Sequence, residues 1–269
     1  MKSLLLAAFA LGTQNVSAQK VAVDDAVATN IQPNMSVGQK FYYEAIVYQI
    51  TVADGSKYNV NAIGFYADEI KETVEIIGSG SANGADFVVD EIEALNSALA
   101  LSGTDFVAGD AAKLAEIELI NFIAEGGFEG TIAANAFANL SGLTDVKTEL
   151  TTPPTADDTA FEAIKSANLT VPDDNADGTI AGKYAVADGW KKFKKMYVDG
   201  YTVDGVAYQF GDVNCDGRLN TRDVTALRSY IGNASAYTGK INLRSVDVNG
   251  DGRKNTRDCT TLRTYIGTR

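Results

Sequence analysis

The chain spells nearly the same twelve residues twice near its C-terminal end, DVNCDGRLNTRD at 212–223 and DVNGDGRKNTRD at 247–258. Aligned at an offset of 35, residues 211–232 and 246–267 are identical at sixteen of twenty-two positions. Both copies have Asp at positions one, five and twelve, Asn at positions three and nine, and Gly at position six. This duplication constrains the fold most, because it predicts two equivalent loop-and-helix units side by side.

The oxygen-bearing residues of each copy have the spacing of a calcium loop. Ca²⁺ takes six to eight oxygen ligands, which an EF-hand loop supplies from positions 1, 3, 5, 7, 9 and 12, with Gly at position 6 for the turn. We therefore predict two bound calcium ions. The expected ligands are Asp212, Asn214, Asp216, the backbone carbonyl of Arg218, Asn220 and Asp223, and in the second loop Asp247, Asn249, Asp251, the carbonyl of Arg253, Asn255 and Asp258.

A short amphipathic segment follows each loop, at 224–232 and at 259–267. Leu, Tyr and Ile recur at helical spacing in both segments, and each segment ends on Gly, which favours a helix stop. Two such short helices can bury their apolar stripes only against each other. The sequence therefore predicts a small all-α module made of a duplicated helical pair.

Two features separate these loops from an EF-hand: position twelve is Asp rather than Glu, and no helical pattern precedes the first loop. Together with the duplication, they resemble the type I dockerin module, over about residues 211–269. The resemblance implies a module that folds on calcium and docks to a cohesin-like partner on a scaffold or cell-surface protein. It implies the recognition residues Thr221, Arg222, Leu227 and Arg228 in the first copy and Thr256, Arg257, Leu262 and Arg263 in the second. Because the two sets are the same, either face could meet the partner.

Charge and composition exclude several functions. The net charge is −12, but residues 211–269 hold ten Lys and Arg against six Asp, a local charge of +4, so the remainder carries −16. An acidic chain of this kind is not expected to bind nucleic acid. His is absent, which excludes Ser-His-Asp and Cys-His catalysis and zinc bound by imidazole.

Residues 1–18 have the features of a secretory signal: an early Lys, an apolar run from Leu4 to Leu11 and small residues before a cleavage site after Ala18. A buried N-terminal helix is the alternative interpretation. The apolar run is too short to span a membrane, and no later run approaches that length. We therefore expect a secreted or cell-surface protein without a membrane span.

The region between the signal and the duplication is expected to be rich in strands. Residues 40–66 predict two or three strands with a turn at 53–56, and apolar residues in 86–101 fit a short helix. Short strands are expected at 113–119 and 142–148, and a strand pair at 194–210. An Ala-Phe pair at 136–137 recurs 24 residues later, at 160–161. A sequence repeat of about this length indicates stacked structural repeats.

These repeats resemble the BspA-like leucine-rich repeats of secreted bacterial surface proteins, with the best match over 130–193. The resemblance implies a short β-rich solenoid with an N-terminal hairpin and the Phe residues inside its coils. An irregular α+β domain is the alternative. Trp190 and Phe193 are interpreted as a hydrophobic plug on the last coil rather than a platform for sugar.

The expected fold class is therefore α+β, with a signal peptide at 1–18, a leucine-rich-repeat-like domain at 19–200, a linker at 201–210 and a dockerin module at 211–269. We expect a non-catalytic exported protein whose repeat domain presents a surface to a host protein or glycan. The alternative is a dockerin-bearing polysaccharide-degrading enzyme with a catalytic carboxylate pair, although nothing in the sequence pairs Glu118, Glu125 and Glu129. Cys215 and Cys259 either form a disulfide or are free thiols.

Overall fold

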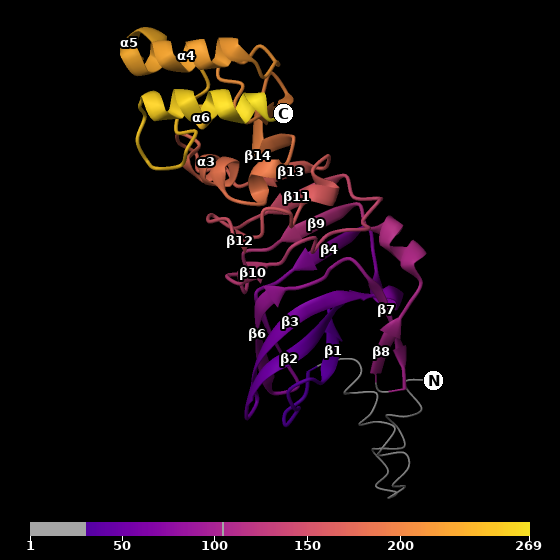
Figure 1. Ribbon diagram of the computed structural model, residues 1–269. Coiled ribbons are helices and arrows are strands. Elements are labelled where there is room, and N and C mark those ends of the chain that lie inside the picture. Colours follow the sequence, from indigo (N-terminus) through magenta and orange to yellow (C-terminus); the bar gives the residue numbers. More distant parts are fainter. Residues whose placement is uncertain (1–30, 104) are drawn as a thin grey trace, which may run out of the picture.

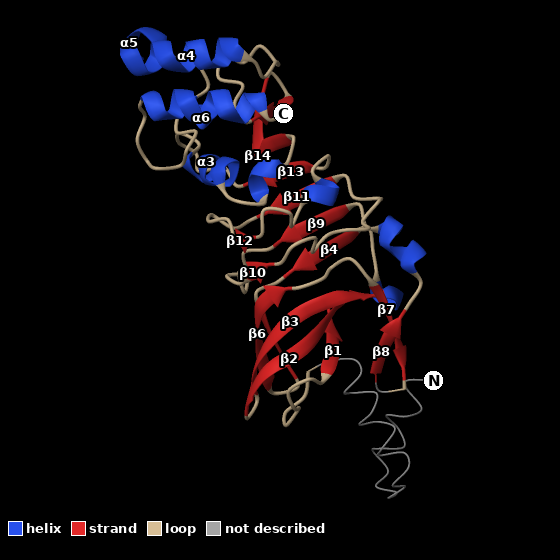
Figure 2. Cartoon of the chain, in the orientation of Figure 1, coloured by secondary structure: helices blue, strands red, loops and turns tan. Residues whose placement is uncertain are grey.

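The computed structural model describes residues 31–103 and 105–269. These residues form a β-rich body and a helical tail, which lies at one end of an elongated molecule (Figures 1 and 2). The secretory signal predicted at 1–18 lies outside the described residues. In the part that is described, no helix is long and apolar enough to cross a membrane.

The first sheet is mixed and begins with the antiparallel meander β1–β2–β3. A parallel pairing joins β3 to β6, and the very short strands β10 and β12 continue the sheet in parallel. The hairpin β7–β8 and strand β5 pair at its margins. Its strands are β1 (Lys40–Tyr43), β2 (Ile46–Asp54), β3 (Lys57–Tyr66), β5 (Ser79–Ala82), β6 (Ala85–Ile92), β7 (Ala98–Ser102), β8 (Asp105–Ala108), β10 (Thr131–Ile132) and β12 (Thr155–Ala156).

The second sheet is a stack of parallel strands in the order β4, β9, β11, β13 and β14, closed by the antiparallel β15. Its register places one buried column across five strands: Val74, Ile120, Val146, Leu169 and Met196. The strands are β4 (Thr73–Ile76), β9 (Leu119–Phe122), β11 (Asp145–Thr148), β13 (Asn168–Val171), β14 (Lys195–Val203) and β15 (Val206–Gln209).

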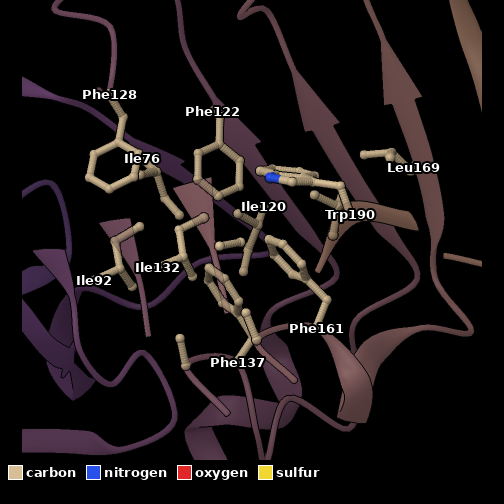
Figure 3. Close-up of a cluster of buried hydrophobic side chains, with 14 of the residues drawn as sticks. Ile76, Ile92, Ile120, Phe122, Phe128, Ile132, Phe137, Phe161, Leu169 and Trp190 are labelled. Atoms are coloured by element: carbon tan, nitrogen blue, oxygen red, sulfur yellow. The ribbon is translucent and has the colours of Figure 1, made fainter. Parts of the chain in front are cut away.

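An aromatic core fills the space behind this column (Figure 3). The two Phe residues of the repeated Ala-Phe pairs, Phe137 and Phe161, stack with ring centroids 5.2 Å apart and planes 7° apart. Trp190 lies 4.5 Å from Phe161 and donates its indole N–H to the Pro154 carbonyl at 2.9 Å. Trp190 and Phe193 are both buried, so they complete the interior of the stack.

Helices occupy the C-terminal part of the described chain. The helix α3 (Thr179–Val186) packs at the end of the second sheet, and the tail contains α4 (Thr221–Gly232), α5 (Ala234–Tyr237) and α6 (Thr256–Gly267). Short 3₁₀ turns are η1 (Ala67–Glu69), η2 (Ala111–Glu116), η3 (Glu162–Ile164), η4 (Trp190–Lys192) and η5 (Leu243–Ser245). Both predicted helices of the tail are confirmed, and they pack against each other.

Two predicted elements of the body are wrong. The helix expected at 86–101 is replaced by β6 and β7, because burial in β6 alternates with period two: Phe87 and Val89 are buried while Val88 is 52% exposed. The strand expected at 113–119 is mostly the turn η2, which begins where the Asp110 carboxylate accepts a hydrogen bond from the Ala112 amide. In contrast, the strands expected within 40–66 and at 142–148 are confirmed.

Residues 201–210, expected as a linker, do not stand apart from the body. They lie in the β14–β15 hairpin, whose first strand is paired with β13 in the second sheet. The hairpin ends directly at the first loop of the tail, where the buried Phe210 packs edge-on against Tyr265 of α6 at 5.6 Å. The tail therefore continues from the sheet without a free connecting segment.

Candidate metal centre

Each loop lies immediately before a helix of the tail and encloses two buried carboxylates, at positions one and twelve. Asp223, Asp247 and Asp258 are 0% exposed, and Asp212 is 7% exposed. The position-five carboxylates, of Asp216 and Asp251, are exposed at the rim. In each loop the carboxylates predicted at positions one and twelve are therefore buried, and the one predicted at position five stays at the rim.

Backbone amides hold the two loops in the same conformation. The carboxylate at position one accepts hydrogen bonds from the Gly amide at position six, at 2.9 Å in both loops (Gly217 to Asp212 and Gly252 to Asp247). These two glycines have φ of +75° and +77°, which residues other than Gly rarely adopt. The Gly at position six is thus required by the turn that aims the first carboxylate inward.

The carboxylate at position twelve also fixes the start of each helix. Asp223 accepts hydrogen bonds from the amides of Asn214 and Asn220, and Asn220 in turn accepts one from the Arg222 amide as N-cap of α4. The second loop repeats this capping box with Asn255 and Asp258. The two helices therefore begin at loop position ten, Thr221 and Thr256, three residues before the apolar segments noted in the sequence.

None of these four buried carboxylates forms an ion pair with a Lys or Arg of the described chain. Burial raises the pKa of Asp223 to about 6, and burial also raises the pKa of Asp212 and of Asp258. A buried carboxylate without a cation is unfavourable by several kcal/mol. Each loop therefore has buried negative charge that no positive group of the described chain balances, and a bound cation would balance it.

The chemistry of the donors fits Ca²⁺. All are oxygens, from carboxylates, Asn amides and the position-seven carbonyl, which is the preference of a hard cation. The Arg218 and Arg253 carbonyls each lie within reach of the Asn amide at position nine, at 3.2 and 3.3 Å, while both Arg side chains are exposed. Across 31–103 and 105–269, no three His, Cys, Asp or Glu side chains gather closely enough to hold a metal alone, so the neutral oxygens are needed.

The expected recognition residues divide into two groups. The Thr and Arg side chains are exposed: Thr221, Arg222, Arg228, Thr256, Arg257 and Arg263. Leu227 and Leu262 are both 0% exposed, in the core between the helices. Their assignment to a partner-binding surface is therefore corrected, because neither side chain reaches the surface.

The two cysteines are free thiols in the structure, one exposed (Cys215) and one buried (Cys259). Burial raises the pKa of both thiols, which disfavours the reactive thiolate.

Sequence reasoning missed a group of residues upstream of the tail that contacts the second loop. The segment 173–178 reads DDNADG and repeats the Asp, Asn, Asp, Gly spacing of the first half of each loop. Two of its three carboxylates bind basic side chains: Asp173 pairs with Arg244, and Asp177 with Lys254. The spacing of Asp, Asn and Gly in this segment could have drawn attention to it, but the sequence does not show that it pairs with Arg244 and Lys254.

The helical pair with paired calcium loops thus defines a small calcium-binding module. Residues 210–267 match the dockerin type I domain, which covers both loops and both long helices. A dockerin domain implies calcium binding and docking to a cohesin partner. The dockerin match does not extend into the β-rich body, and no family match supports the leucine-rich-repeat interpretation of that body.

Comparisons with curated proteins and with solved structures add little to the dockerin match. No curated protein matches the chain. Among solved structures, the crystal structure of the pneumococcal vaccine antigen PcpA is similar over 62% of this chain and 39% of that one, at 13% identity and a TM-score of 0.28. The chain thus spans about two fifths of that antigen's length, and a likeness this low carries no argument about fold or function.

Proposed function

We propose that this protein is a non-catalytic, exported docking subunit. Its tail binds two calcium ions, one in each loop, and attaches the β-rich body to a cohesin-like module on a scaffold or cell-surface protein. The observation that carries the proposal is the pair of matching loops, each with two buried carboxylates that no basic side chain of the described chain neutralises.

Calcium binding is coupled to folding of the tail in this proposal. The carboxylate at position twelve is both a ligand and the capping group of the following helix. Ligands that are assembled only in the folded state convert binding free energy into folding free energy. The helices, and the surface that they present, are thus expected to depend on calcium.

The docking surface is formed by the exposed Thr and Arg residues at the start of each helix. Arg222 and Arg228 on α4, and Arg257 and Arg263 on α6, give each helix a basic exposed side. A partner surface of acidic character fits these residues, since complementary charge speeds association and fixes orientation.

Two features support a body without catalytic activity. The chain contains no His. Glu118, Glu125 and Glu129, the acidic candidates for a glycosidase pair, are all exposed on the surface rather than enclosed in a cleft. We assign the body to a leucine-rich-repeat-like domain, on the basis of its stacked parallel strands and the repeated buried Phe residues, with a role in presenting a surface to a protein or glycan.

The test is a pull-down from the envelope and secreted fractions of the producing cell, with the immobilised full chain, in calcium and in chelator. A loss-of-binding variant, Asp216→Ala/Asp251→Ala, is tested in parallel. It removes an exposed predicted ligand from each loop without touching the helix caps. The proposal is supported if the unmodified chain retains a cohesin-like partner in calcium, and if both the chelator and the double variant abolish that binding. No calcium-dependent partner would reject docking, and hydrolysis of a polysaccharide panel that a single Glu→Gln change abolishes would reject the non-catalytic assignment.

A further inference from the structure

The β-rich body contacts the two loops differently. In the second loop it reaches the side chain of the position-one carboxylate, whereas in the first loop it reaches the backbone, where the Tyr208 hydroxyl of β15 donates to the Asp212 carbonyl at 2.9 Å. The body contributes the turn before α3 and the first part of that helix, residues 173–183, which contact residues 244–254 of the tail; we refer to this as the interdomain contact. Figure 1 shows α3 next to α6, with α4 on the far side. The two loops are alike in conformation but differ in surroundings.

Hydrogen bonds from the body reach a predicted calcium ligand. The Thr179 hydroxyl lies 2.6 Å from Oδ2 of Asp247, the position-one carboxylate of the second loop, and 2.7 Å from Oδ1 of Asp177. The Asp177 carbonyl also accepts hydrogen bonds from the amides of Val246 and Asp247, at 3.3 and 3.1 Å. The body therefore holds both the backbone and the side chain of the first ligand.

Two close backbone approaches show how tightly the surfaces fit. A Cβ added to Gly182 of α3 would lie 2.3 Å from the Asp247 carbonyl oxygen, and one added to Gly178 would lie 1.9 Å from the carbonyl oxygen of Arg244. From the other side, a Cβ on Gly250 would lie 2.5 Å from the Lys183 amide nitrogen. Only glycine fits at these three positions.

The differences between the two copies of the loop fall on this contact. Where the first copy has Gly211, Cys215 and Leu219, the second has Val246, Gly250 and Lys254. Two of these replacements serve the interdomain contact: Gly250 gives room for α3, and Lys254 pairs with the Asp177 carboxylate at 2.9 Å. At the same position as Gly250, the first loop carries the exposed Cys215.

The charges at the contact give a reason for calcium to strengthen it. The Thr179 hydroxyl has one proton, so it can donate to the carboxylate of Asp177 or of Asp247, but not to both at once. At the carboxylate that receives no proton, a lone pair of the hydroxyl oxygen faces a negatively charged oxygen. Lys254 forms an ion pair with Asp177 and acts on Asp247 only through its electrostatic field. A cation on Asp247 would lower the repulsion between the two carboxylates across the shared hydroxyl.

We infer that Thr179 is a positioning residue for calcium at the second loop, and that the ion held there fastens the tail to the β-rich body. At the first loop the position-one carboxylate accepts hydrogen bonds from amides of its own loop, so its side chain has no equivalent link to the body. The inference rests on calcium binding by the tail and concerns its regulation. The second loop is thus an interdomain site, coupled in both directions to the stability of the body.

The first test is a calcium titration of the full chain by calorimetry in an Asp216→Ala background, which leaves the second loop as the site measured. Thr179→Val should weaken calcium binding there about tenfold, as loss of an outer-sphere hydrogen bond does, and Thr179→Ser should restore it. The matched control is Thr159→Val: Thr159 makes the same 2.7 Å contact, with Asp157, and belongs neither to a loop nor to the interdomain contact. Equal affinities for the Thr179→Val and Thr159→Val variants would overturn the inference.

The second test uses Trp190, the single Trp of the chain, which is buried in the body and packs edge-on against Tyr184 of α3 at 5.1 Å. Calcium should raise the unfolding temperature followed by Trp190 fluorescence in the unmodified chain and in Gly232→Ala, where a Cβ meets no neighbour within 4 Å. Gly182→Ala should abolish that shift while calcium still increases helicity. A shift retained in Gly182→Ala would overturn the coupling, whereas a chain that binds no calcium would overturn the proposed function as well.

Discussion

At the scale of single residues, the carboxylate at position twelve of each loop links ion binding to helix formation. Asp223 accepts amide hydrogen bonds from the loop and from the N-cap residue of α4, and it is fully buried. The same oxygens are the predicted calcium ligands. Without a cation, this side chain has to be buried charged or become protonated, and both alternatives oppose the folded loop.

We therefore predict that Asp223→Asn removes calcium binding at the first loop and leaves the second loop filled. The amide keeps the shape of the side chain but removes the charge that compensates the ion. Calorimetry on the full chain should show the stoichiometry falling from two to one. The control is Asp204→Asn, the same change in charge at an exposed turn; equal losses at both loops in Asp223→Asn would show that the loops are strongly coupled.

The ligand set could be predicted from the sequence because a calcium loop is local: twelve adjacent residues specify the turn, the donors and the cap. The errors concern residues whose surroundings are not local. Leu227 and Leu262 belong to the apolar stripes that were themselves predicted to be buried, and burial between the helices overrides a surface role. Thr179 could not be found, since its carboxylate partner in the second loop is sixty-eight residues away.

At the scale of elements, the body depends on the alignment of successive strands and of the Phe residues behind them. Phe161 contacts Phe137, Trp190 and Phe193 with ring centroids 4.5 to 5.2 Å apart. It therefore links the segment that carries Phe137 to the turn η4. In the proposed repeat architecture, contacts of this kind between neighbouring segments supply most of the stability.

We predict that Phe161→Ala destabilises the body by about 3–5 kcal/mol, because it removes a fully buried aromatic ring and leaves a cavity. Urea unfolding followed by Trp190 fluorescence measures the change. Val206→Ala, at a side chain that is 69% exposed, should change stability by less than about 0.5 kcal/mol. Similar midpoints for the two variants would contradict the role assigned to this ring.

Helices α4 and α6 are short, and each begins at a calcium loop. Isolated helices of this length are marginal in water, so their stability has to come from packing and capping. We predict that chelation lowers the helical signal in far-ultraviolet circular dichroism, that added calcium restores it, and that the strand signal of the body persists. Unchanged helicity in chelator would rule out calcium-dependent folding of the tail.

The strands were predicted well where one face is solvated and the alternation of apolar and polar residues is clear. In 86–101 the apolar residues also matched helical spacing, and the pairing of β6 with β3 makes this segment a strand with alternating burial. The linker expected at 201–210 failed for a related reason. Strands β14 and β15 extend the parallel stack by long-range pairing, which short segments of sequence do not reveal.

At the scale of the whole molecule, the interdomain contact makes a nearly symmetric tail asymmetric. Helix α4 lies at the far end of the molecule, whereas α6 lies between α4 and the body (Figure 1). Beside α6 is a groove of about 710 Å³, formed by threonines of that helix and lysines at the end of the body, among them Lys165, Lys191 and Lys192. The exposed Thr and Arg residues of the two helices therefore have different neighbours: those of α6 share their helix with this groove, and those of α4 do not.

A docked protein module covers about 800 Å² on each side of an interface, so it needs a broad and open surface. The exposed side of α4, with Arg222 and Arg228, offers this without interference from the body, whereas a partner on α6 would meet the wall of the groove. We predict that Arg222→Glu/Arg228→Glu weakens docking at least tenfold and that Arg257→Glu/Arg263→Glu, the equivalent change on α6, weakens it less than threefold, since the partner then selects one orientation. Biolayer interferometry of both double variants against the captured cohesin-like partner, with calcium present, measures the difference. Equal losses would mean that both orientations are used and that the body leaves α6 free to dock.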